Sequence, residues 1–331
     1  MKKILVTGGA GFIGYHLTDH LQKTDAHITI IDNLSRSKVD EAFSSLCKKT
    51  NVTFINADMT GPNFTSNLAD YYDEIYHLAA VNGTKNFYSM PQIVLKVNIL
   101  SLIYLLEWIS ADNCGKFVFT SSSEAYAGTI SRFGIQYNFI PTKEDIPLTI
   151  DDVFNARFSY GGSKLAGELL TVNYCRAKKV PFSIVRYHNI YGPRMGFDHV
   201  IPEFCERIYR QVTPFPIYGG GDTRAFCYVS DGVHATQLVM ESAACNEQVV
   251  HIGNDTEEIT IRDMAKVLFD VCGYTSPIML EEAPKGSVKR RCPDISKLKR
   301  LVGFKPVMSL REGLVLTSTW YMNYWKTTEP T

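Results

Sequence analysis

The sequence predicts an α/β fold built on a doubly wound parallel sheet, with a smaller C-terminal lobe that is interleaved with the sheet in sequence. Three observations predict it. Short apolar runs alternate with helix-length segments in the first half, these runs are too apolar to face water, and a glycine-rich turn joins the first run to the first helix. The 331 residues, 45% of them hydrophobic, are enough to bury a core of that size.

Six apolar runs in the first half of the chain are the expected strands. They are Lys3–Thr7, Ile28–Ile31, Val52–Ile55, Glu74–His77, Phe117–Thr120 and Phe182–Arg186. Segments of helical length and pattern lie between them, at residues 12–22, 91–110 and 155–178. Strands connected by helices pair in parallel, because each crossover returns the chain to the same edge of the sheet.

The pattern changes after residue 187, where glycine and proline divide the chain into shorter pieces. The turns are Tyr191-Gly192-Pro193, the proline-rich stretch 214–216 and Gly219-Gly220-Gly221, followed by a strand-like run at Phe226–Val229. A helical segment at 231–243 and a strand-like one at 249–252 are expected to return to the first sheet. We therefore predict a sheet domain of residues 1–187 plus about 227–252, and a second lobe of about 188–226 plus 253–331.

Charge and cysteine content exclude several classes of function. Lysine plus arginine and aspartate plus glutamate number 34 each, so no basic field is expected to bind nucleic acid or an anionic membrane, and the partner is a small molecule. The eight cysteines form no CxxC pair, which disfavours a disulfide framework, and we expect no metal. With no apolar segment that would cross a membrane, the chain is expected to work in a reducing cytoplasm.

The turn after the first expected strand has the composition of a dinucleotide-binding site. Its sequence, TGGAGFIG at residues 7–14, opens a helix whose backbone amides and dipole favour a pyrophosphate. Asp32 ends the second expected strand, 18 residues after Gly14, and is placed to accept hydrogen bonds from an adenosine ribose. Its carboxylate repels the extra phosphate of NADP, so NAD is the expected cofactor. Arg36 nearby would instead favour NADP. Agreement of glycines, strand, helix and carboxylate disfavours a glycine-rich turn that binds nothing.

A second group of residues is suited to proton transfer. Tyr160 and Lys164 stand four residues apart in the segment YGGSK, on one face of a helix. A tyrosine with its ordinary pKa of about 10 is a poor base at neutral pH, but a cation alongside it stabilises the phenolate. The run TSSSEAY at 120–126 follows an expected strand, at the edge where open parallel sheets bind ligands, and Glu124 in it offers a carboxylate for a second proton transfer. Taken alone, each segment is also typical of an exposed helix face or a solvated loop.

Together these segments resemble the extended short-chain dehydrogenase/reductases, in particular nucleotide-sugar 4-epimerases, 4,6-dehydratases and UDP-glucuronate decarboxylases. The resemblance covers essentially the whole chain and implies a Rossmann-type fold for the sheet domain. Its motifs are TGGAGFIG (7–14), IDNLSRS (31–37), AD (57–58), HLAA (77–80), TSSSEAY (120–126), YGGSK (160–164), RYHNIYGPR (186–194) and YGGGDTRAFCYVSD (218–231).

The resemblance implies a role for each matching residue. Tyr160 would be the catalytic base, Lys164 the residue that lowers its pKa and holds the nicotinamide ribose, Ser122 the hydroxyl on the sugar, and Glu124 a further acid or base. The implied NAD site consists of Gly8, Gly11, Phe12, Ile13, Gly14, Asp32, Asn33, Ser35, Asp58, Met59, Leu78, Ala79, Ala80, Tyr160 and Lys164. The implied nucleotide-sugar site consists of Ser122, Ser123, Asn189, Arg224 and Arg291, with Lys289 and Arg290 competing for the role of Arg291.

The resemblance leaves the reaction open. The shared first step would transfer hydride from C4 of the sugar to NAD and give a 4-keto sugar. A 4-epimerase then needs little beyond Ser122, Tyr160 and a roomy pocket, and is our expectation. Ser122-Ser123-Glu124 and the segment TRAFCYVSD favour a decarboxylase, although the helix start of the UDP-glucuronate decarboxylases differs from Gly161-Gly162-Ser163. Glu124 favours a dehydratase, although Ser123 stands where glucose-type dehydratases have aspartate. A non-catalytic NAD-binding scaffold or redox sensor would not need the intact Ser122, Tyr160 and Lys164.

Two segments depart from the commonest family patterns. Ala127 stands where a glycine usually follows the tyrosine, and VNGTKNF at 81–87 replaces the usual continuation of HLAA. Because relatives place both beside the sugar, the substrate is expected to be unusual, and its nucleotide, sugar and C4 configuration stay open. Residues 127–150 are expected to form a long loop, either a lid or a surface excursion.

An apolar stripe on the expected helix 91–110 bears on oligomeric state. It carries Tyr104, Leu105 and Trp108, and relatives use the corresponding face to pair two subunits. We therefore expect a homodimer, although in a monomer the same stripe would be part of the core.

Overall fold

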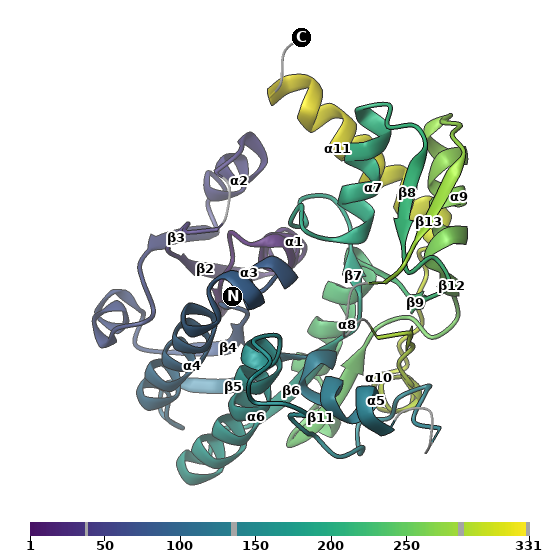
Figure 1. Cartoon of the computed structure of the whole chain (residues 1–331). Helices are drawn as coiled ribbons and strands as arrows, with labels where there is room; N and C mark the ends of the chain where they lie inside the picture. The colour runs from purple at the N-terminus through teal and green to yellow at the C-terminus, as the bar shows by residue number, and fades with distance from the viewer. Residues whose placement is uncertain (37–38, 134–137, 284–287, 329–331) are drawn as a thin grey trace.

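A seven-stranded sheet forms the centre of the computed structural model, which describes all residues except 37–38, 134–137, 284–287 and 329–331 (Figure 1). Its strand order is β11-β6-β5-β4-β1-β2-β3, and every neighbouring pair is parallel. The strands are β1 (Lys2–Thr7), β2 (Ala26–Asp32), β3 (Val52–Asn56), β4 (Tyr72–His77), β5 (Cys114–Ser122), β6 (Phe182–Tyr187) and β11 (Gln248–Ile252). The order runs outward in both directions from β1 and β4, which confirms the predicted doubly wound α/β fold.

Helices cover both faces of the sheet (Figure 1). The principal ones are α1 (Phe12–Leu21), α4 (Pro91–Trp108), α6 (Phe158–Lys178) and α8 (Val229–Glu241). Along β1, Leu5 joins the core that is covered by α4 and α6, whereas Ile4 and Val6 join the core that is covered by α1 and α8. Successive residues of a strand point to opposite faces, so an unbroken apolar run packs against two helix layers at once.

A second group of shorter elements lies beside the sheet, on the right of Figure 1. It contains β8 (Phe215–Tyr218) paired with β13 (Ile278–Glu281), the sheet β12-β9-β14 (Glu258–Thr260, Thr223–Ala225, Arg290–Arg291), α7 (Val200–Tyr209), α9 (Ile261–Cys272), α10 (Ser296–Val302) and α11 (Leu310–Thr328). Between its parts the chain passes through α8 and β11, and β11 pairs with β6 of the large sheet. The remaining elements are α2 (Glu41–Cys47), η1 (Pro62–Asn67), α3 (Thr84–Ser89), η2 (Ser123–Tyr126), α5 (Ala127–Phe133), β7 (Ile190–Tyr191), β10 (Cys227–Tyr228) and η3 (Ala243–Cys245).

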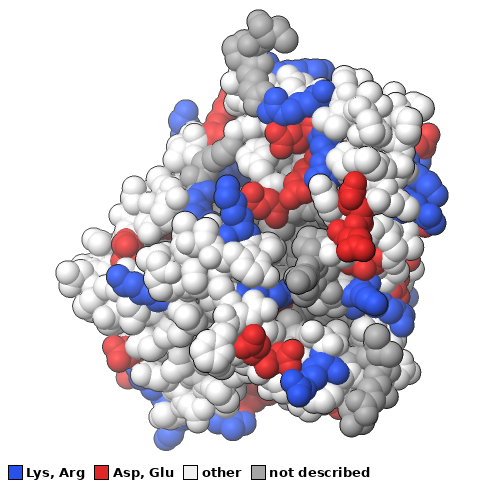
Figure 2. Space-filling model, in the orientation of Figure 1, with Lys and Arg blue, Asp and Glu red and all other residues white. Residues whose placement is uncertain are grey.

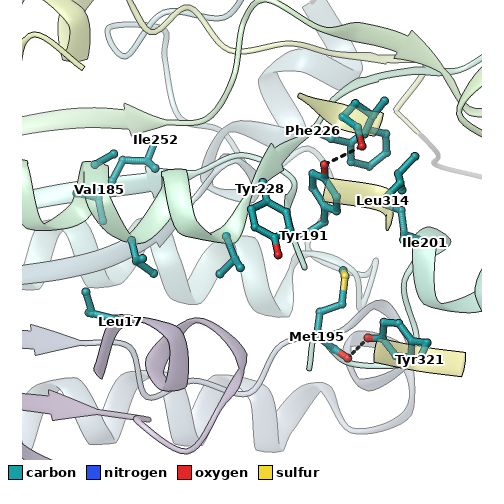
Figure 3. Close-up of a cluster of buried hydrophobic side chains, with 14 of the residues drawn as sticks. Leu17, Val185, Tyr191, Met195, Ile201, Phe226, Tyr228, Ile252, Leu314 and Tyr321 are labelled. Carbon is teal, nitrogen blue, oxygen red and sulfur yellow. Dashed lines mark hydrogen bonds between the residues drawn. The ribbon is translucent and has the colours of Figure 1, made fainter. Parts of the chain in front are cut away.

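One hydrophobic cluster joins the sheet to this second group (Figure 3). Leu17 and Val185 enter it from α1 and β6, and Tyr191 and Tyr321 enter it from β7 and α11. The buried hydroxyl of Tyr321 donates a hydrogen bond to the backbone carbonyl of Met195, which satisfies a group that would otherwise be costly to bury. Apolar burial therefore fixes the segment after β7 against the sheet, and this segment forms one wall of the cleft described below.

Two local expectations need correction. Residues 127–150 are not wholly a loop, because 127–133 form the helix α5, in which Gly128 is buried. A side chain on Gly128 would stand 2.3 Å from the carbonyl oxygen of Thr149, so the two ends of the segment pack closely together; residues 134–137 lie outside the described residues. The expected strand at 226–229 is reduced to the two residues of β10, since Val229 already begins α8. Ser37, the last residue of IDNLSRS, also lies outside the described residues.

The helix α4 has the length and apolar composition of a membrane span, yet it packs against the sheet and α6. Leu105 of the predicted apolar stripe is fully buried, and Tyr104 and Trp108 are half-buried against the same core. The Trp108 ring meets Tyr72 edge-on, with centroids 6.2 Å apart. Much of the stripe is therefore core, and pairing of two subunits through this helix stays a prediction.

Charged side chains of both signs are interspersed over the surface, as the face in Figure 2 shows. Exposed pairs such as Arg210 with Glu206 (2.9 Å) stabilise a protein by only about 0.5 kcal/mol. The pair of Arg186 and Glu168 differs, because their side chains are only 4% and 7% exposed. Two hydrogen bonds of 2.8 Å join them, and Glu168 also accepts one from Ser121 at 2.5 Å. This network fixes α6 to the ends of β5 and β6.

We expect Arg186→Met to lower the free energy of unfolding by about 3–5 kcal/mol, because it leaves the Glu168 carboxylate buried without its cation. The measurement is urea denaturation followed by circular dichroism. The double variant Arg186→Met/Glu168→Leu, which removes both charges, should recover most of the loss. A double variant as unstable as the single one would show that volume and not charge sets the effect.

Candidate functional site

A cavity of about 530 Å³ lies along the carboxyl ends of the strands. Its lining includes all the residues predicted for the cofactor and the catalytic centre. They are Gly8, Gly11, Phe12, Ile13, Gly14, Asp32, Asn33, Ser35, Asp58, Met59, Leu78, Ala79, Ala80, Ser122, Glu124, Tyr160 and Lys164. Of the residues predicted for the substrate, Ser123, Asn189 and Arg291 line it as well, but Arg224 does not. The structure thus brings together residues that are spread over most of the chain.

The glycine turn between β1 and α1 has no room for side chains. Gly8 has a φ of +68°, and a Cβ there would stand 2.7 Å from the backbone nitrogen of Ala79 on the neighbouring strand's extension. A Cβ on Gly14 would stand 2.2 Å from the carbonyl oxygen of Gly8. Gly11 precedes the first residue of α1 and brings no capping side chain, so the first turn of the helix is open to the cavity. Such a turn is suited to a pyrophosphate held by backbone amides.

Two aspartates shape the adenosine end of the cavity. Asp32 accepts hydrogen bonds from the backbone nitrogens of Ala10 (3.1 Å) and Leu34 (2.8 Å), so its carboxylate ties the glycine turn to the loop after β2. Asp58 accepts a hydrogen bond from the backbone nitrogen of Thr60 at 2.8 Å and thereby stabilises its own turn. Both carboxylates keep a position on the cavity wall, where a ribose and an adenine are predicted to bind.

Two arginines connect the loop after β2 to other walls of the cleft. Arg36 donates a hydrogen bond to the side-chain oxygen of Asn82 at 2.8 Å. Arg194, in the segment after β7, pairs with Asp40 and stands 4.1 Å over the ring centre of Tyr15. Arg36, the residue that kept NADP as an alternative cofactor in the sequence, is therefore hydrogen-bonded to Asn82 across the cleft. No sequence pattern predicts the Arg194–Asp40 pair, because the two residues are far apart along the chain.

The proton-transfer residues meet where β5 ends beside α6. Ser122 lies beside Tyr160 and acts to lower its pKa. Lys164 donates a hydrogen bond to the carbonyl oxygen of Thr120 at 2.8 Å, with its Nζ 5.6 Å from the Tyr160 ring centre. Burial raises the pKa of Tyr160 to about 12, although Ser122 and Arg36 act to lower it. Burial lowers the pKa of Lys164 to about 7. At neutral pH the phenol is thus protonated in the protein alone, and a lowering of its pKa by Lys164 stays a prediction.

Glu124 lies between two arginines beside this centre. Its carboxylate is 2.8 Å from Arg291 and 3.5 Å from Arg157, and the three side chains are only 14% to 18% exposed. Burial by itself would raise the pKa of Glu124, but Arg291 and Arg157 outweigh it and hold the pKa below its ordinary value. Glu124 is therefore ionised and suited to holding cations more than to donating a proton. Arg157 was not singled out in the sequence, since nothing in the loop before YGGSK marks it.

The other predicted substrate residues lie close to this cluster. Asn189 has a φ of +43° and donates a hydrogen bond to the carbonyl oxygen of Ala225 at 3.1 Å. Arg224 stands 3.8 Å from Asp222, and burial together with the charge of Arg291 lowers its pKa to about 10. Arg224 therefore adds positive charge behind the cavity wall and does not itself line the wall. Among the residues that the structure describes, no three His, Cys, Asp or Glu side chains gather as metal ligands would.

Comparison with known proteins gives a consistent picture. Residues 4–253 match the model of the NAD dependent epimerase/dehydratase family. A curated relative, the UDP-N-acetyl-alpha-D-glucosaminuronate decarboxylase of Bacillus cytotoxicus, is 32% identical over 97% of this chain and 98% of its own.

Two solved structures share the whole fold. The UDP-glucose 4-epimerase of Thermotoga maritima with UDP-glucose has a TM-score of 0.84 at 30% identity, covering 97% of this chain and 99% of that one. The UDP-glucuronic acid 4-epimerase of Bacillus cereus, in complex with UDP-glucuronic acid and NAD, has a TM-score of 0.80 at 26% identity, with the same coverage. NAD is the cofactor of this group, and the open helix start, the crowded glycines and the carboxylate of Asp32 fit it.

We expect Gly14→Ala to weaken NAD binding at least about tenfold, because the added Cβ forces the turn away from the helix start. Isothermal titration calorimetry on protein stripped of NAD measures the effect. Gly61→Ala is the matched control, since no atom would lie within 4 Å of its Cβ. Equal affinities of Gly14→Ala and the unaltered protein would rule out this turn as the pyrophosphate site.

Proposed function

The chain belongs to the NAD-dependent epimerase/dehydratase family, and we propose that it acts on a UDP-linked hexuronate and removes the C6 carboxylate of the sugar as carbon dioxide. The single observation that carries this proposal is the buried cluster in which Arg157 and Arg291 flank Glu124 beside the reacting centre. The Bacillus cytotoxicus relative, a decarboxylase of a UDP-linked uronate, supports it.

The charge of this cluster favours an anionic sugar. Arg157 and Arg291 both pair with Glu124, and Arg224 stands 3.8 Å from Asp222 close to the same cluster. Guanidinium groups beside a cavity can form charge-assisted hydrogen bonds with an anionic ligand, and a neutral hexose offers no anion. The diphosphate of the nucleotide would take one share of the positive charge, and a carboxylate on the sugar would take another.

The cluster also lies next to the proton-transfer residues. The hydroxyl of Ser122 accepts a hydrogen bond from the backbone nitrogen of Glu124 at 3.2 Å, and the same serine acts on the pKa of Tyr160. A Cβ on Gly161 would stand 2.5 Å from the carbonyl oxygen of Glu124, so η2 and the start of α6 are in close contact. In the proposed binding mode the C4 hydroxyl lies on Ser122 and Tyr160, and C6 points toward the arginines.

The residues of the chain then perform the proton chemistry. When bound, NAD accepts hydride from C4 and later returns it, and its positive charge favours the phenolate of Tyr160. Ser122 would hydrogen-bond the C4 oxygen while Tyr160 takes its proton. In the resulting ketone the C6 carboxylate is on the carbon next to the carbonyl. Cleavage of the C5–C6 bond releases carbon dioxide and moves the electron pair to the C4 oxygen, where Ser122 and the Tyr160 hydroxyl donate hydrogen bonds. C5 then takes a proton from water.

A 4-epimerase, the reaction expected from the sequence, is the second candidate. The similarity to the UDP-glucuronic acid 4-epimerase of Bacillus cereus favours it. The same arginines would then hold the carboxylate without its loss, and the keto sugar would be reduced on its other face.

The product distinguishes the two reactions. We expect the purified protein, incubated in D2O with UDP-glucuronic acid or its N-acetylglucosamine counterpart, to release carbon dioxide and give a UDP-pentose with one deuterium at C5. Mass spectrometry and NMR of the product measure both. A UDP-hexuronate of unchanged mass and inverted C4 would establish the epimerase, and turnover of neutral UDP-hexoses alone would overturn the uronate proposal.

Tyr160→Phe removes only the oxygen that takes the C4 proton. We expect turnover to fall by about 10³-fold or more while NAD binding is retained. Tyr88→Phe, on the exposed side of α3, is the matched control and should leave turnover unchanged. A Tyr160→Phe variant with normal turnover would exclude this residue as the base.

Arg291→Gln tests the recognition of the carboxylate. We expect KM for the UDP-hexuronate to rise by about 10–100-fold, because a charge-assisted hydrogen bond contributes about 1.5–3 kcal/mol. Arg290→Gln is the control, since Arg290 pairs with Glu258 (2.7 Å) and is half exposed. Equal effects of the two variants on KM would contradict a specific role for Arg291.

A further inference from the structure

The ring of Phe87 stacks on the ring of Tyr160. Their centroids are 4.9 Å apart and their planes are 12° from parallel. Phe87 lies on α3, within the unusual segment 81–87, and is 7% exposed while it still lines the cavity. With Val81, Val94 and Val97 it forms an apolar wall on one side of the phenol. The segment that departs most from the family pattern thus contacts the proposed base directly.

Hydrogen bonds hold this segment against the helix that carries Tyr160. The buried side chain of Asn98 accepts from the backbone nitrogen of Val81 (2.7 Å) and donates to the carbonyl oxygen of Val81 (3.2 Å) and to the hydroxyl of Ser163 (3.0 Å). Ser163 in turn donates to the carbonyl oxygen of Tyr160 at 2.7 Å. Asn98 therefore links the start of the segment to the first turn of α6, and the stacked arrangement is anchored at its base.

The rest of the segment 81–87 is anchored as well. Arg36 donates to the side-chain oxygen of Asn82, and Asn86 donates to the carbonyl oxygen of Asn82 at 2.7 Å. These contacts fix the turn at Gly83, whose φ of +101° is one that side chains rarely adopt. Hydrogen bonds thus hold this short segment at Val81 and at Asn82. The backbone that they fix determines the position of the Phe87 ring.

We propose that Phe87 is a positioning residue for Tyr160, whose flat ring fixes the plane of the phenol and shields one of its faces from water. This inference rests on the proposed function, in which Tyr160 takes the C4 proton. A phenol free to turn about its side-chain bonds would lose its alignment with Ser122, and a misplacement of about 1 Å is enough to slow a proton transfer strongly.

The groups around the phenol of Tyr160 determine how loss of the apolar wall would change its pKa. Ser122, Glu124, Lys164 and Arg36 lie around the phenol, and burial is the largest influence on its pKa. Because burial disfavours the phenolate, water admitted through the apolar wall would lower the pKa of Tyr160, whereas loss of flatness alone would not.

The test separates the two effects with three substitutions in the NAD-bound enzyme, labelled with ¹³C at the tyrosine Cζ. Phe87→Ala removes both the apolar wall and the flat aromatic ring. We therefore expect the midpoint of the Tyr160 NMR titration to fall by about one pH unit and kcat to fall about tenfold or more. Phe87→Leu keeps an apolar wall without a flat face, and should lower kcat with little change in the titration. Phe87→Tyr keeps the ring and should restore both. Tyr160→Phe assigns the signal.

Phe64→Leu, a substitution of a buried phenylalanine in a different hydrophobic cluster from that of Phe87 and Tyr160, is the matched control and should change neither quantity. An unchanged titration and kcat in Phe87→Ala, or equal changes in Phe64→Leu, would overturn the proposal. The titration needs no turnover. If no UDP-sugar reacts but the Phe87 variants still shift the Tyr160 signal, the positioning role stands and the proposed reaction fails.

Discussion

The parallel arrangement of the seven strands is the constraint on which the rest of the structure depends. Right-handed crossovers bring the carboxyl end of every strand to one edge, so Thr7, Asp32, His77 and Ser122 finish close together although they span much of the sequence. Thr7 shows how tightly this edge is joined. Its hydroxyl accepts hydrogen bonds from the backbone nitrogens of Leu78 and Ala79, each at 3.2 Å, so the end of β1 holds the segment after β4.

The close approach of backbones at this edge explains the glycines. Gly8 and Gly14 stand where any Cβ would meet backbone atoms, and backbone atoms move less readily than flexible side chains. The cofactor cleft that results is bridged on two sides, by Arg36 with Asn82 and by Arg194 with Asp40. Local sequence chemistry makes the turn, and pairs between distant segments define the cleft around it.

Charge has two different roles in the interior. Arg186 and Glu168 satisfy each other almost completely and fix the helix α6 to the sheet, which is a structural role. Arg157 and Arg291 both pair with Glu124, and Glu124 and Arg291 line the cavity. An arginine that lines a cavity is suited to an anionic ligand, because it can donate charge-assisted hydrogen bonds to that ligand. The apolar wall of Phe87 lies on the other side of Tyr160, so that residue stands between a charged and an apolar environment.

The sequence by itself determined the doubly wound sheet, the glycine turn and the positions of Asp32, Ser122 and Tyr160, because apolar periodicity, turn glycines and motif spacing are local properties of the chain. It left α5 inside 127–150 undetected and overextended the strand at 226–229, since short elements depend on packing more than on pattern. Only the tertiary structure decided that Arg157 and Arg291 meet at Glu124, that Arg224 stands behind the wall, and that Phe87 stacks on Tyr160. These contacts join residues far apart in sequence, and the distance between such residues is set by how the layers pack, which no local pattern encodes.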